Sequence, residues 1–287
     1  MLETGQKVGK YEIIGRLGEG GTGRVYLARD CTLLRLAAVK QMRGEYEEGV
    51  LLETGFLRDL RHPMLPVVYD LLREKDWYLA MEYVEGISLH NYIKKTGPVG
   101  EEIGRIWAES LLSILEYLHN RKPPVIYRDL KPENIMVCQD KSLRLVDFGA
   151  ACRKDFGEDT DRGMALTRGY GAPEQQAVTG RPVYADERSD IYAFGRVLYY
   201  MLTGANPGEP PYGSLPVSAY NPLLGKAIER VIEKCTRENP LERYQIAGEI
   251  RQDLSQKSRG SRRDKRKAFV RHVEKRVWLT EKVTAGL

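Results

Sequence analysis

The sequence has few cysteines and no long apolar run. Its four cysteines lie far apart and form no CxxC pair, so we expect neither a disulfide framework nor a zinc site. No stretch approaches the ~18 consecutive apolar residues that indicate a membrane-spanning helix. The first fifteen residues also lack the charged start and apolar core of a secretory signal. These absences predict a cytoplasmic protein with reduced thiols.

The positive charge of the chain is concentrated at its C-terminal end. The whole chain has a formal net charge of +5. Residues 255–287 hold eleven Lys/Arg and three Asp/Glu, a balance of +8, which leaves 34 basic and 37 acidic residues in 1–254. The main body therefore gives no indication of nucleic-acid binding. The 287 residues, of which 42% are hydrophobic, suffice for a large globular domain.

The period of the hydrophobic residues changes along the chain. Residues 11–40 and 66–84 are short alternating runs between glycine-rich or charged turns, a pattern typical of antiparallel strands. Apolar residues at helical spacing predict helices over 45–60, 101–118, 190–202 and 223–235. We therefore expect an α+β fold, in which a small strand-rich lobe precedes a larger helical lobe and a hinge near 83–86 joins them.

A glycine-rich loop lies near the start of the first strand region. Gly18, Gly20 and Gly23 form a GxGxxG pattern that is followed by Val25. Glycines allow the backbone to approach phosphate closely, with amide groups as donors. The pattern is weak alone, because dinucleotide-binding folds and ordinary turns also contain it. A dinucleotide fold would need a helix directly afterwards, whereas a strand-like segment follows here.

Lys40 closes the apolar run Ala37-Ala38-Val39. A lysine at the end of a buried strand needs an anionic partner if its ammonium points inward, although such side chains commonly extend to solvent instead. Glu53, on the helix expected over 45–60, is the favoured partner. Glu47 and Glu48 are alternatives by proximity alone.

The strongest signal is the segment Val125–Val137, which presents Asp129, Lys131 and Asn134 in one short loop between apolar runs. A second apolar run then leads to Asp147 in an Asp-Phe-Gly sequence. Two carboxylates and an amide on neighbouring loops suit magnesium, which takes few protein oxygens and completes its shell with phosphates and water. Asp-Phe-Gly alone would be an ordinary Asx turn. The chain, however, contains in order the glycine-rich loop, the strand-end Lys40, the loop that carries Asp129, the Asp-Phe-Gly sequence and an Ala-Pro-Glu sequence, a combination far too specific for chance.

Over residues 11–254 the chain resembles the eukaryotic-type protein kinase family, and within it the bacterial serine/threonine branch. The resemblance implies a bilobal kinase fold with an N-lobe over 11–83 and a C-lobe over 84–254. It also implies transfer of the ATP γ-phosphoryl group to protein Ser/Thr hydroxyls in bacterial signalling. Residues 1–10 would then be a lead-in and 255–287 a basic tail.

By the same resemblance, Asp129 would be the catalytic base and Lys131 would steady the γ-phosphate. Lys40, paired with Glu53, would hold the α/β-phosphates, and Asn134 and Asp147 would bind Mg²⁺ or Mn²⁺. Glu174 would pair with Arg243, and Asp190 would anchor the catalytic loop. The nucleotide would contact Gly18, Gly20, Gly23, Val25, Ala38, Met81 (the gatekeeper, which borders the adenine site), Glu82, Val84 and Met136.

Two departures from the family pattern stand out. Tyr127 replaces the usual histidine before Arg-Asp, a change that active kinases also show. Glu53 follows Lys40 by only thirteen residues, which indicates either a shortened connection or another glutamate as the partner.

Two other functions compete with that of a protein kinase. One is a pseudokinase that only binds partners, and the other is a small-molecule phosphotransferase of related fold. All charged residues needed for turnover are present, which disfavours the pseudokinase. The Ala-Pro-Glu segment disfavours the small-molecule phosphotransferase.

Two regulatory features are also predicted. Thr160 is the candidate activating phosphosite, because Thr167 matches a threonine that the family uses structurally and Arg128 lies beside the base. In the tail, seven Lys/Arg within 257–267 precede a helix whose apolar stripe extends to Trp278. Segment 257–278 would bind an anionic membrane surface, at the inner face, or an acidic partner. The alternative is that this helix packs on the kinase body.

Overall fold

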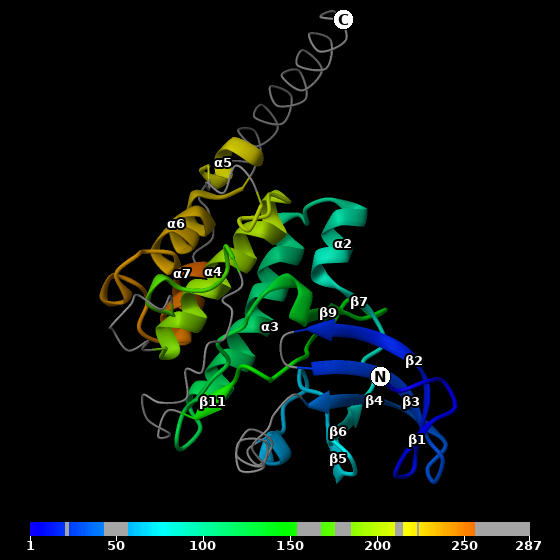
Figure 1. The fold of residues 1–287 in the computed structure, drawn as a ribbon. Coiled ribbons are helices and arrows are strands. Elements are labelled where there is room, and N and C mark those ends of the chain that lie inside the picture. Colours follow the sequence, from blue (N-terminus) through cyan, green and yellow to red (C-terminus); the bar gives the residue numbers. More distant parts are fainter. Residues whose placement is uncertain are drawn as a thin grey trace, which may run out of the picture.

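Six antiparallel strands form the sheet of the N-terminal lobe in a computed structural model of the chain (Figure 1). The model describes residues 1–20, 23–42, 57–153, 168–175, 185–209, 215–222 and 224–255. The strands lie in the spatial order β1-β2-β3-β4-β6-β5. Their bounds are β1 Lys7–Val8, β2 Tyr11–Gly20, β3 Gly23–Asp30, β4 Arg35–Met42, β5 Val68–Arg73 and β6 Trp77–Glu82. These strands confirm the antiparallel prediction for 11–40 and 66–84.

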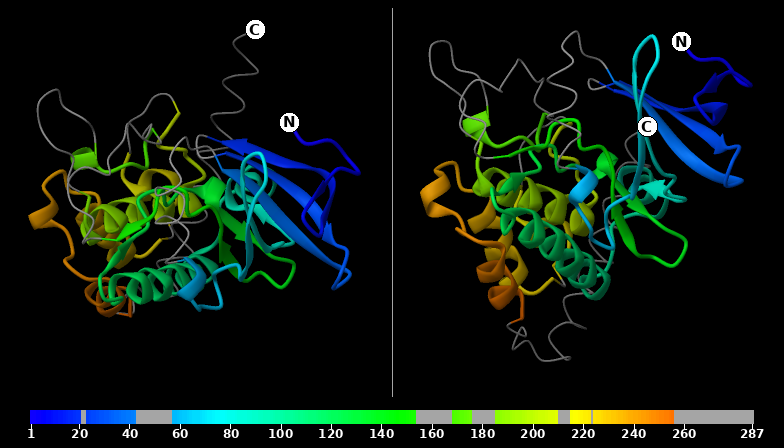
Figure 2. Two further views of the ribbon diagram at one scale, coloured as in Figure 1. Left: turned by 60° about the horizontal axis from the view of Figure 1, so that its bottom comes forward. Right: turned by 90° about the horizontal axis from the view of Figure 1, so that it is seen from below.

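The two faces of this sheet differ because side chains alternate along each strand. Tyr26, Val39 and Tyr78 belong to a small core on one face. Ala38 and Lys40 of β4, which alternate with Val39, lie on the other face. Figure 2 shows this sheet beside the helical lobe. The alternation that predicts the strands therefore also directs Lys40 into the space between the lobes.

The first ten residues add to this sheet. β1 pairs with Tyr11 and Glu12 of β2, and Val8 is fully buried. Backbone hydrogen bonds also join Gly5 and Gln6 to Ile13. The segment expected as a lead-in thus contributes an edge strand, while the domain boundary at residue 11 stays a prediction.

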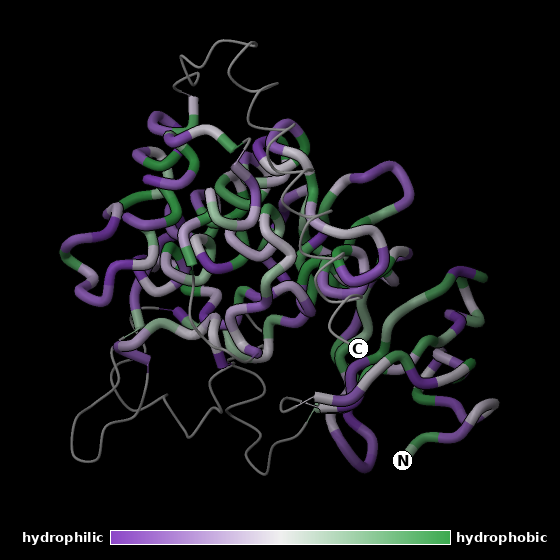
Figure 3. The backbone as a smooth tube through the Cα atoms, turned by 90° about the horizontal axis from the view of Figure 1, so that it is seen from above, coloured by the Kyte–Doolittle hydropathy of each residue, from purple (hydrophilic) through white to green (hydrophobic). Residues whose placement is uncertain are grey.

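The second lobe is mainly helical, and hydrophobic residues gather inside it while hydrophilic segments lie at its periphery (Figure 3). Its α-helices are α2 Leu89–Thr96, α3 Glu101–His119, α4 Glu187–Thr203, α5 Val217–Tyr220, α6 Lys226–Cys235 and α7 Ala247–Ser255. Short strands are β7 Ile87–Ser88, β8 Val125–Ile126, β9 Ile135–Val137, β10 Leu143–Leu145 and β11 Cys152–Arg153. Single 3₁₀ turns are η1 Leu57–Asp59, η2 Pro132–Asn134, η4 Pro173–Gln175 and η5 Pro240–Glu242.

Helix α4 forms the centre of the helical lobe. Asp186 and Ser189 form a capping box at its N-terminus, and Gly204 in the left-handed conformation, with φ of 70°, ends it. A Cβ at Gly195 would lie 2.6 Å from Cys235 Cβ, so this glycine allows α6 to pack closely on α4. Because its side chains are buried nearly all round, α4 is a rigid base for the loops above it.

The helix predictions differ from the structure mainly at their ends. α3 is confirmed, and α4 starts at Glu187 because Asp186 caps it. α6 starts at Lys226, after the N-cap Gly225. Of the helix expected over 45–60, residues 43–56 lie outside the described part, and Leu57–Asp59 form a 3₁₀ turn. Among the described helices, none combines the length and apolar character needed to cross a membrane.

Candidate active site

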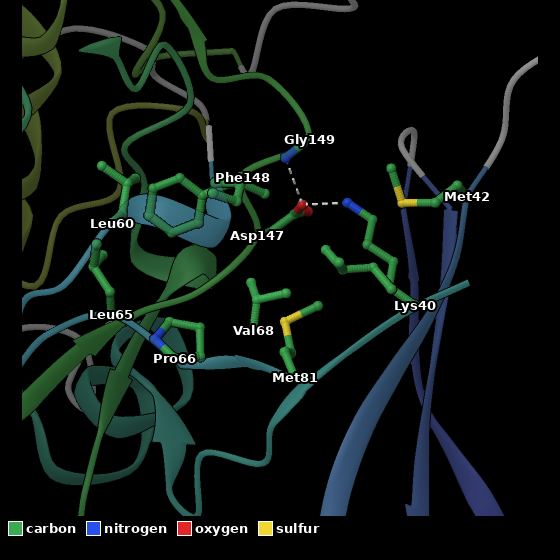
Figure 4. Close-up of a pocket in the computed structure, with 12 residues that line it drawn as sticks. Lys40, Met42, Leu60, Leu65, Pro66, Val68, Met81, Asp147, Phe148 and Gly149 are labelled. Atoms are coloured by element: carbon green, nitrogen blue, oxygen red, sulfur yellow. Dashed lines mark hydrogen bonds and ion pairs between the residues drawn. The ribbon is translucent and has the colours of Figure 1, made fainter. Parts of the chain in front are cut away.

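Lys40 and Asp147 meet between the two lobes. Lys40 Nζ lies 2.6 Å from Asp147 Oδ1 (Figure 4). The Lys40 side chain is only 5% exposed, whereas that of Asp147 is one-third exposed. A buried ammonium requires such a partner, so the lysine does not extend to solvent. Glu53, the partner expected from the sequence, lies outside the described residues.

The backbone at Asp147 has an uncommon conformation, with φ of 64°. It is the left-handed region, in which Asp is tolerated better than most residues. Burial of the Asp147 carboxyl opposes ionisation, but the Lys40 charge, the hydrogen bond to it and the Gly149 amide outweigh this effect. The pKa of Asp147 is therefore lowered, and the carboxylate is ionised at neutral pH.

Asp129, Lys131 and Asn134 come together as the sequence predicts. Lys131 Nζ lies 2.7 Å from Asp129 Oδ2, and Asn134 Nδ2 donates to the same oxygen at 2.9 Å. Asn134 Nδ2 also donates to the Asp129 carbonyl oxygen at 2.9 Å. The 3₁₀ turn Pro132–Asn134 returns Asn134 toward Asp129. The loop thus holds a carboxylate beside an ammonium at the edge of the cleft.

Asp190 anchors this loop from beneath. Its fully buried carboxylate accepts hydrogen bonds from the backbone N–H groups of Tyr127, at 2.8 Å, and Arg128, at 2.7 Å. His119 Nε2 lies 2.9 Å from Asp190 Oδ2. Arg128 has φ of 68°, a conformation that these contacts stabilise. The predicted role of Asp190 therefore has a geometric basis on α4.

The oxygen atoms around the cleft suit a magnesium ion that is shared with phosphates. Asn134 Nδ2 is engaged with Asp129, so the atom that Asn134 offers a metal is its amide oxygen. Asp147 offers a carboxylate, and the described residues contain no cluster of three or more His, Cys, Asp or Glu that could hold a metal ion. Two oxygen-bearing side chains would suit a divalent metal ion that also keeps water or phosphate ligands.

The glycines of the GxGxxG pattern lie at the ends of β2 and β3, where Gly18 pairs with Val25 and Gly20 with Gly23. Among the atoms of the described residues, a Cβ at Gly18 or Gly20 would meet none within 4 Å, so packing against the described residues does not require these two glycines. At Gly23 the backbone has φ of 148°, and a Cβ would lie 2.1 Å from the Gln41 carbonyl oxygen. Only glycine fits at the start of β3.

The residues expected around adenine come from both lobes. Val25 and Ala38 lie on neighbouring strands of the N-terminal sheet, and Ala38 pairs with Met81. Met136 lies on β9 of the helical lobe, where it pairs with Ser88 next to the hinge. Glu82 ends β6, and Val84 is buried directly after it. This placement suits a flat ring held between the lobes.

An apolar pocket continues from the cleft behind Met81. It is lined by Leu60, Leu65, Val68, Leu79 and Phe148, with Lys40 and Asp147 at one side (Figure 4). The ring of Phe148 packs against Tyr127, with centroids 5.0 Å apart and an interplanar angle of 77°. Phe148 therefore fixes the segment that carries Asp147 against the catalytic loop.

Glu174 and Arg243 form the predicted pair. The Arg243 guanidinium contacts the Glu174 carboxylate twice, at 2.7 and 2.8 Å, and its side chain is fully buried. Ser189 Oγ also donates to Glu174, at 2.8 Å. The turn Pro173–Gln175 is thereby tied to α4 and to the segment before α7.

Comparison with known proteins identifies the family. The model of the protein kinase domain matches residues 11–215. The chain belongs to the protein kinase domain family. It is 32% identical over 265 residues to the serine/threonine-protein kinase PrkC of Bacillus subtilis, covering 86% of this chain and 40% of PrkC. It is 33% identical over 270 residues to the serine/threonine-protein kinase PknB of Mycobacterium tuberculosis, covering 85% of this chain and 42% of PknB. The chain thus spans about two-fifths of the length of these relatives.

The fold of this kinase domain is shared with solved structures. The crystal structure of the Mycobacterium tuberculosis PknI kinase domain superposes with a TM-score of 0.68 at 24% identity, covering 88% of this chain and 98% of that one. At this identity the similarity shows the fold alone. The bilobal α+β architecture expected from the sequence is confirmed.

Three contacts of the catalytic loop were not anticipated from the sequence. His119 bonds to Asp190, Gln175 Nε2 donates to the Arg128 carbonyl at 3.2 Å, and the Tyr127 hydroxyl donates to the carbonyls of Val146 and Asp147. His119 lies outside the motifs, whereas Gln175 directly follows Ala-Pro-Glu and Tyr127 belongs to the segment Val125–Val137. Only the position of Tyr127 beside Arg-Asp gave a signal that could have directed attention to its hydroxyl.

Proposed function

We propose that this kinase domain transfers the γ-phosphoryl group of ATP to serine or threonine hydroxyls of proteins, in bacterial signalling. The observations that support this most directly are the contacts of Asp129 with Lys131 and Asn134 and the contact of Lys40 with Asp147. The charge of Lys131 also contributes to the lowered pKa of Asp147, which links the two sets of residues. Phosphoryl transfer depends on positioning and on neutralisation of charge, and these five side chains supply both.

Each residue has a chemical task in this proposal. Asp129 accepts the proton of the attacking hydroxyl, and Lys131, 2.7 Å from that carboxylate, steadies the γ-phosphate. Lys40 binds the α/β-phosphates from the N-terminal lobe. Asn134 and Asp147 would hold the metal, which would supply positive charge to neutralise the phosphates. We expect Mg²⁺ to support activity, with Mn²⁺ as a possible substitute, because hard oxygen ligands suit both.

A protein substrate is favoured over a small molecule. The segment around Glu174 is fixed to the helical lobe through the buried Arg243, which provides a rigid platform beside Asp129 for an extended peptide. A pseudokinase would lack one of the charged residues that this chain retains.

The proposed kinase activity is tested by the incorporation of labelled phosphate from ATP into casein and myelin basic protein, with and without EDTA. Incorporation that is absent from wild type, or that persists in Asp129→Asn, would contradict the proposal.

Thr160 is proposed as the activating phosphosite, and it lies outside the described residues. The support is Arg128, which neighbours Asp129 and whose backbone is fixed through Asp190 and Gln175. The Arg128 side chain would supply a guanidinium for the phosphate. Mass spectrometry after ATP treatment tests occupancy, and wild-type activity in Thr160→Ala would contradict a switch.

The basic segment 257–278 is proposed to bind an anionic membrane surface, so that a cytoplasmic kinase domain would be held at the inner face. This segment also lies outside the described residues, and its support is the +8 balance of 255–287. Co-sedimentation with phosphatidylglycerol vesicles at low and high salt should show pelleting of the full chain that salt removes. Equal pelleting of the full-length and 1–254 proteins with the vesicles would contradict the proposal. Binding of the full-length protein to an acidic protein, without binding to the vesicles, would indicate the acidic partner instead.

A further inference from the structure

An ion pair joins the hinge to the strand that leads to Asp147. Arg144 lies on β10, and its Nη2 is 2.6 Å from Oε2 of Glu82 at the end of β6. β6 belongs to the N-terminal sheet and β10 to a separate three-stranded sheet of the other lobe. The side chains are 20% and 30% exposed. The pair therefore crosses between the lobes in a partly shielded setting.

Both members of this pair also bind the segment that enters β5. Arg144 Nη2 donates to the Leu65 carbonyl oxygen at 3.0 Å, and Glu82 Oε2 accepts from the Val67 N–H at 3.1 Å. Backbone bonds support the same junction, from Glu82 N to Val67 O at 2.8 Å and from Leu145 N to Met64 O at 2.7 Å. Residues 64–67 are thus held to β6 and β10 together.

The contacts among Glu82, Arg144 and residues 64–67 lie between two parts of the expected nucleotide site, the hinge and Asp147. Glu82 directly follows Met81 and precedes the expected hinge 83–86, while Arg144 precedes Asp147 by three residues. Three residues of extended chain span only about 10 Å. A shift of the end of β6 relative to β10 would therefore move the adenine-binding backbone relative to Asp147, although a nucleotide must contact both at once.

We propose that Glu82 and Arg144 are positioning residues, which fix the hinge relative to β10 and so preorganise the cleft for ATP. The inference rests on the proposed ATP-dependent function. In this proposal Glu82 meets the nucleotide through its backbone alone, and neither the Glu82 nor the Arg144 side chain contacts it. Without the pair, the free protein samples more arrangements of hinge and Asp147, and binding must then select one of them at a cost in affinity.

The variants are chosen to remove the charge interaction with little change in shape. Glu82→Gln keeps an acceptor for the Val67 N–H, and Arg144→Gln removes the guanidinium. The matched control is Arg105→Gln. Arg105 also contacts one carboxylate, that of Glu101 at 2.8 Å, and one backbone carbonyl, that of Leu254. The side chains of Arg105 and Glu101 are similarly shielded, at 25% and 20% exposure. This pair lies within α3, and only the bond to the Leu254 carbonyl reaches α7.

The measurement is calorimetric titration of the full chain with MgADP, alongside steady-state kinetics with ATP. We expect the Kd of Glu82→Gln and of Arg144→Gln to rise roughly three- to tenfold, as lost preorganisation predicts. The double variant should have the same Kd as the single variants, kcat should change less than KM, and Arg105→Gln should bind MgADP as wild type does.

Three results would overturn the inference: unchanged or tighter binding by Glu82→Gln and Arg144→Gln, additive effects of the two substitutions on Kd, or an equal rise in Kd for Arg105→Gln. Absence of nucleotide binding by the wild type would overturn the proposed function and this inference with it.

Discussion

The Tyr127 hydroxyl donates a hydrogen bond to the carbonyl oxygen of Asp147 at 3.0 Å, and to that of Val146 at 2.6 Å. Tyr127 is fully buried, and burial together with the negative charges of Asp147, Asp129 and Asp190 raises the pKa of its hydroxyl well above the ordinary value. The hydroxyl therefore remains protonated and continues to donate across the usable pH range. It links the catalytic loop to the backbone of the expected metal ligand.

Tyr127→Phe should lower kcat by up to about tenfold, because one buried hydrogen bond contributes about 1 kcal/mol and two carbonyls lose their donor. The KM for a peptide substrate should change little. The matched control is Tyr199→Phe, whose hydroxyl donates to the Leu215 carbonyl at 3.1 Å, away from the cleft. Equal losses of kcat in the two variants would contradict a positioning role for Tyr127.

Asp129→Asn should reduce the rate of phosphate transfer by about a hundredfold or more, in keeping with the contribution of a general base. Lys40→Met should abolish activity as well, since it removes the ammonium that contacts Asp147. Both side chains lie at a polar cleft, so the fold should remain nearly intact, which circular dichroism can verify. Activity of Asp129→Asn within a factor of two of wild type would disprove the assigned base.

Arg243→Met should destabilise the helical lobe by about 3–5 kcal/mol, because it leaves the Glu174 carboxylate partly buried without its cation. Arg251→Met is the control. Arg251 contacts Glu109 and Glu116 in more exposed pairs, and such pairs contribute about 0–1 kcal/mol. Urea unfolding at neutral pH measures both variants. Similar midpoints for the two would show that burial of the Glu174 pair contributes little.

The lowered pKa of Asp147 predicts a particular pH dependence of stability. A carboxyl whose folded pKa is depressed stabilises the protein above its unfolded pKa, and this contribution is lost as pH falls through the folded value. The difference in unfolding free energy between wild type and Asp147→Asn should therefore favour wild type most above pH ~4 and shrink on further acidification. A difference that grows toward low pH would show that Lys40 and the Gly149 amide do not stabilise the ionised form.

The cysteines should differ in their reaction with thiol reagents. Cys31 is exposed and should be modified first. Burial raises the pKa of Cys152, against the opposing effect of Arg128, and raises that of the fully buried Cys235. Because the thiolate is the reactive form, both should react slowly in the native protein. Iodoacetamide labelling followed by peptide mapping checks this order, which rapid modification of Cys235 without unfolding would contradict.

The sequence by itself determined the fold class, the two lobes and the residues of the catalytic loop. Strand alternation and helical period are local properties of the chain, and Asp129, Lys131 and Asn134 lie within six residues of each other. Their meeting follows from one short loop. The capping box of Asp186 and Ser189 that starts α4 is also a local feature of the chain, although the expected helix began only at residue 190.

The tertiary structure decided which charges of the two lobes meet, whereas the distant pair of Glu174 and Arg243 was already expected from the family resemblance. Lys40 contacts Asp147, 107 positions away, and Arg144 contacts Glu82, 62 positions away. The sequence did not indicate Asp147 as a partner of Lys40 or Glu82 as a partner of Arg144, because many carboxylates in the chain satisfy a cation equally well. Glu53, the partner expected for Lys40, lies outside the described residues and stays a prediction. The choice among them depends on how two sheets from different lobes pack against each other. That packing depends on contacts spread over the whole chain, so no local pattern determines it.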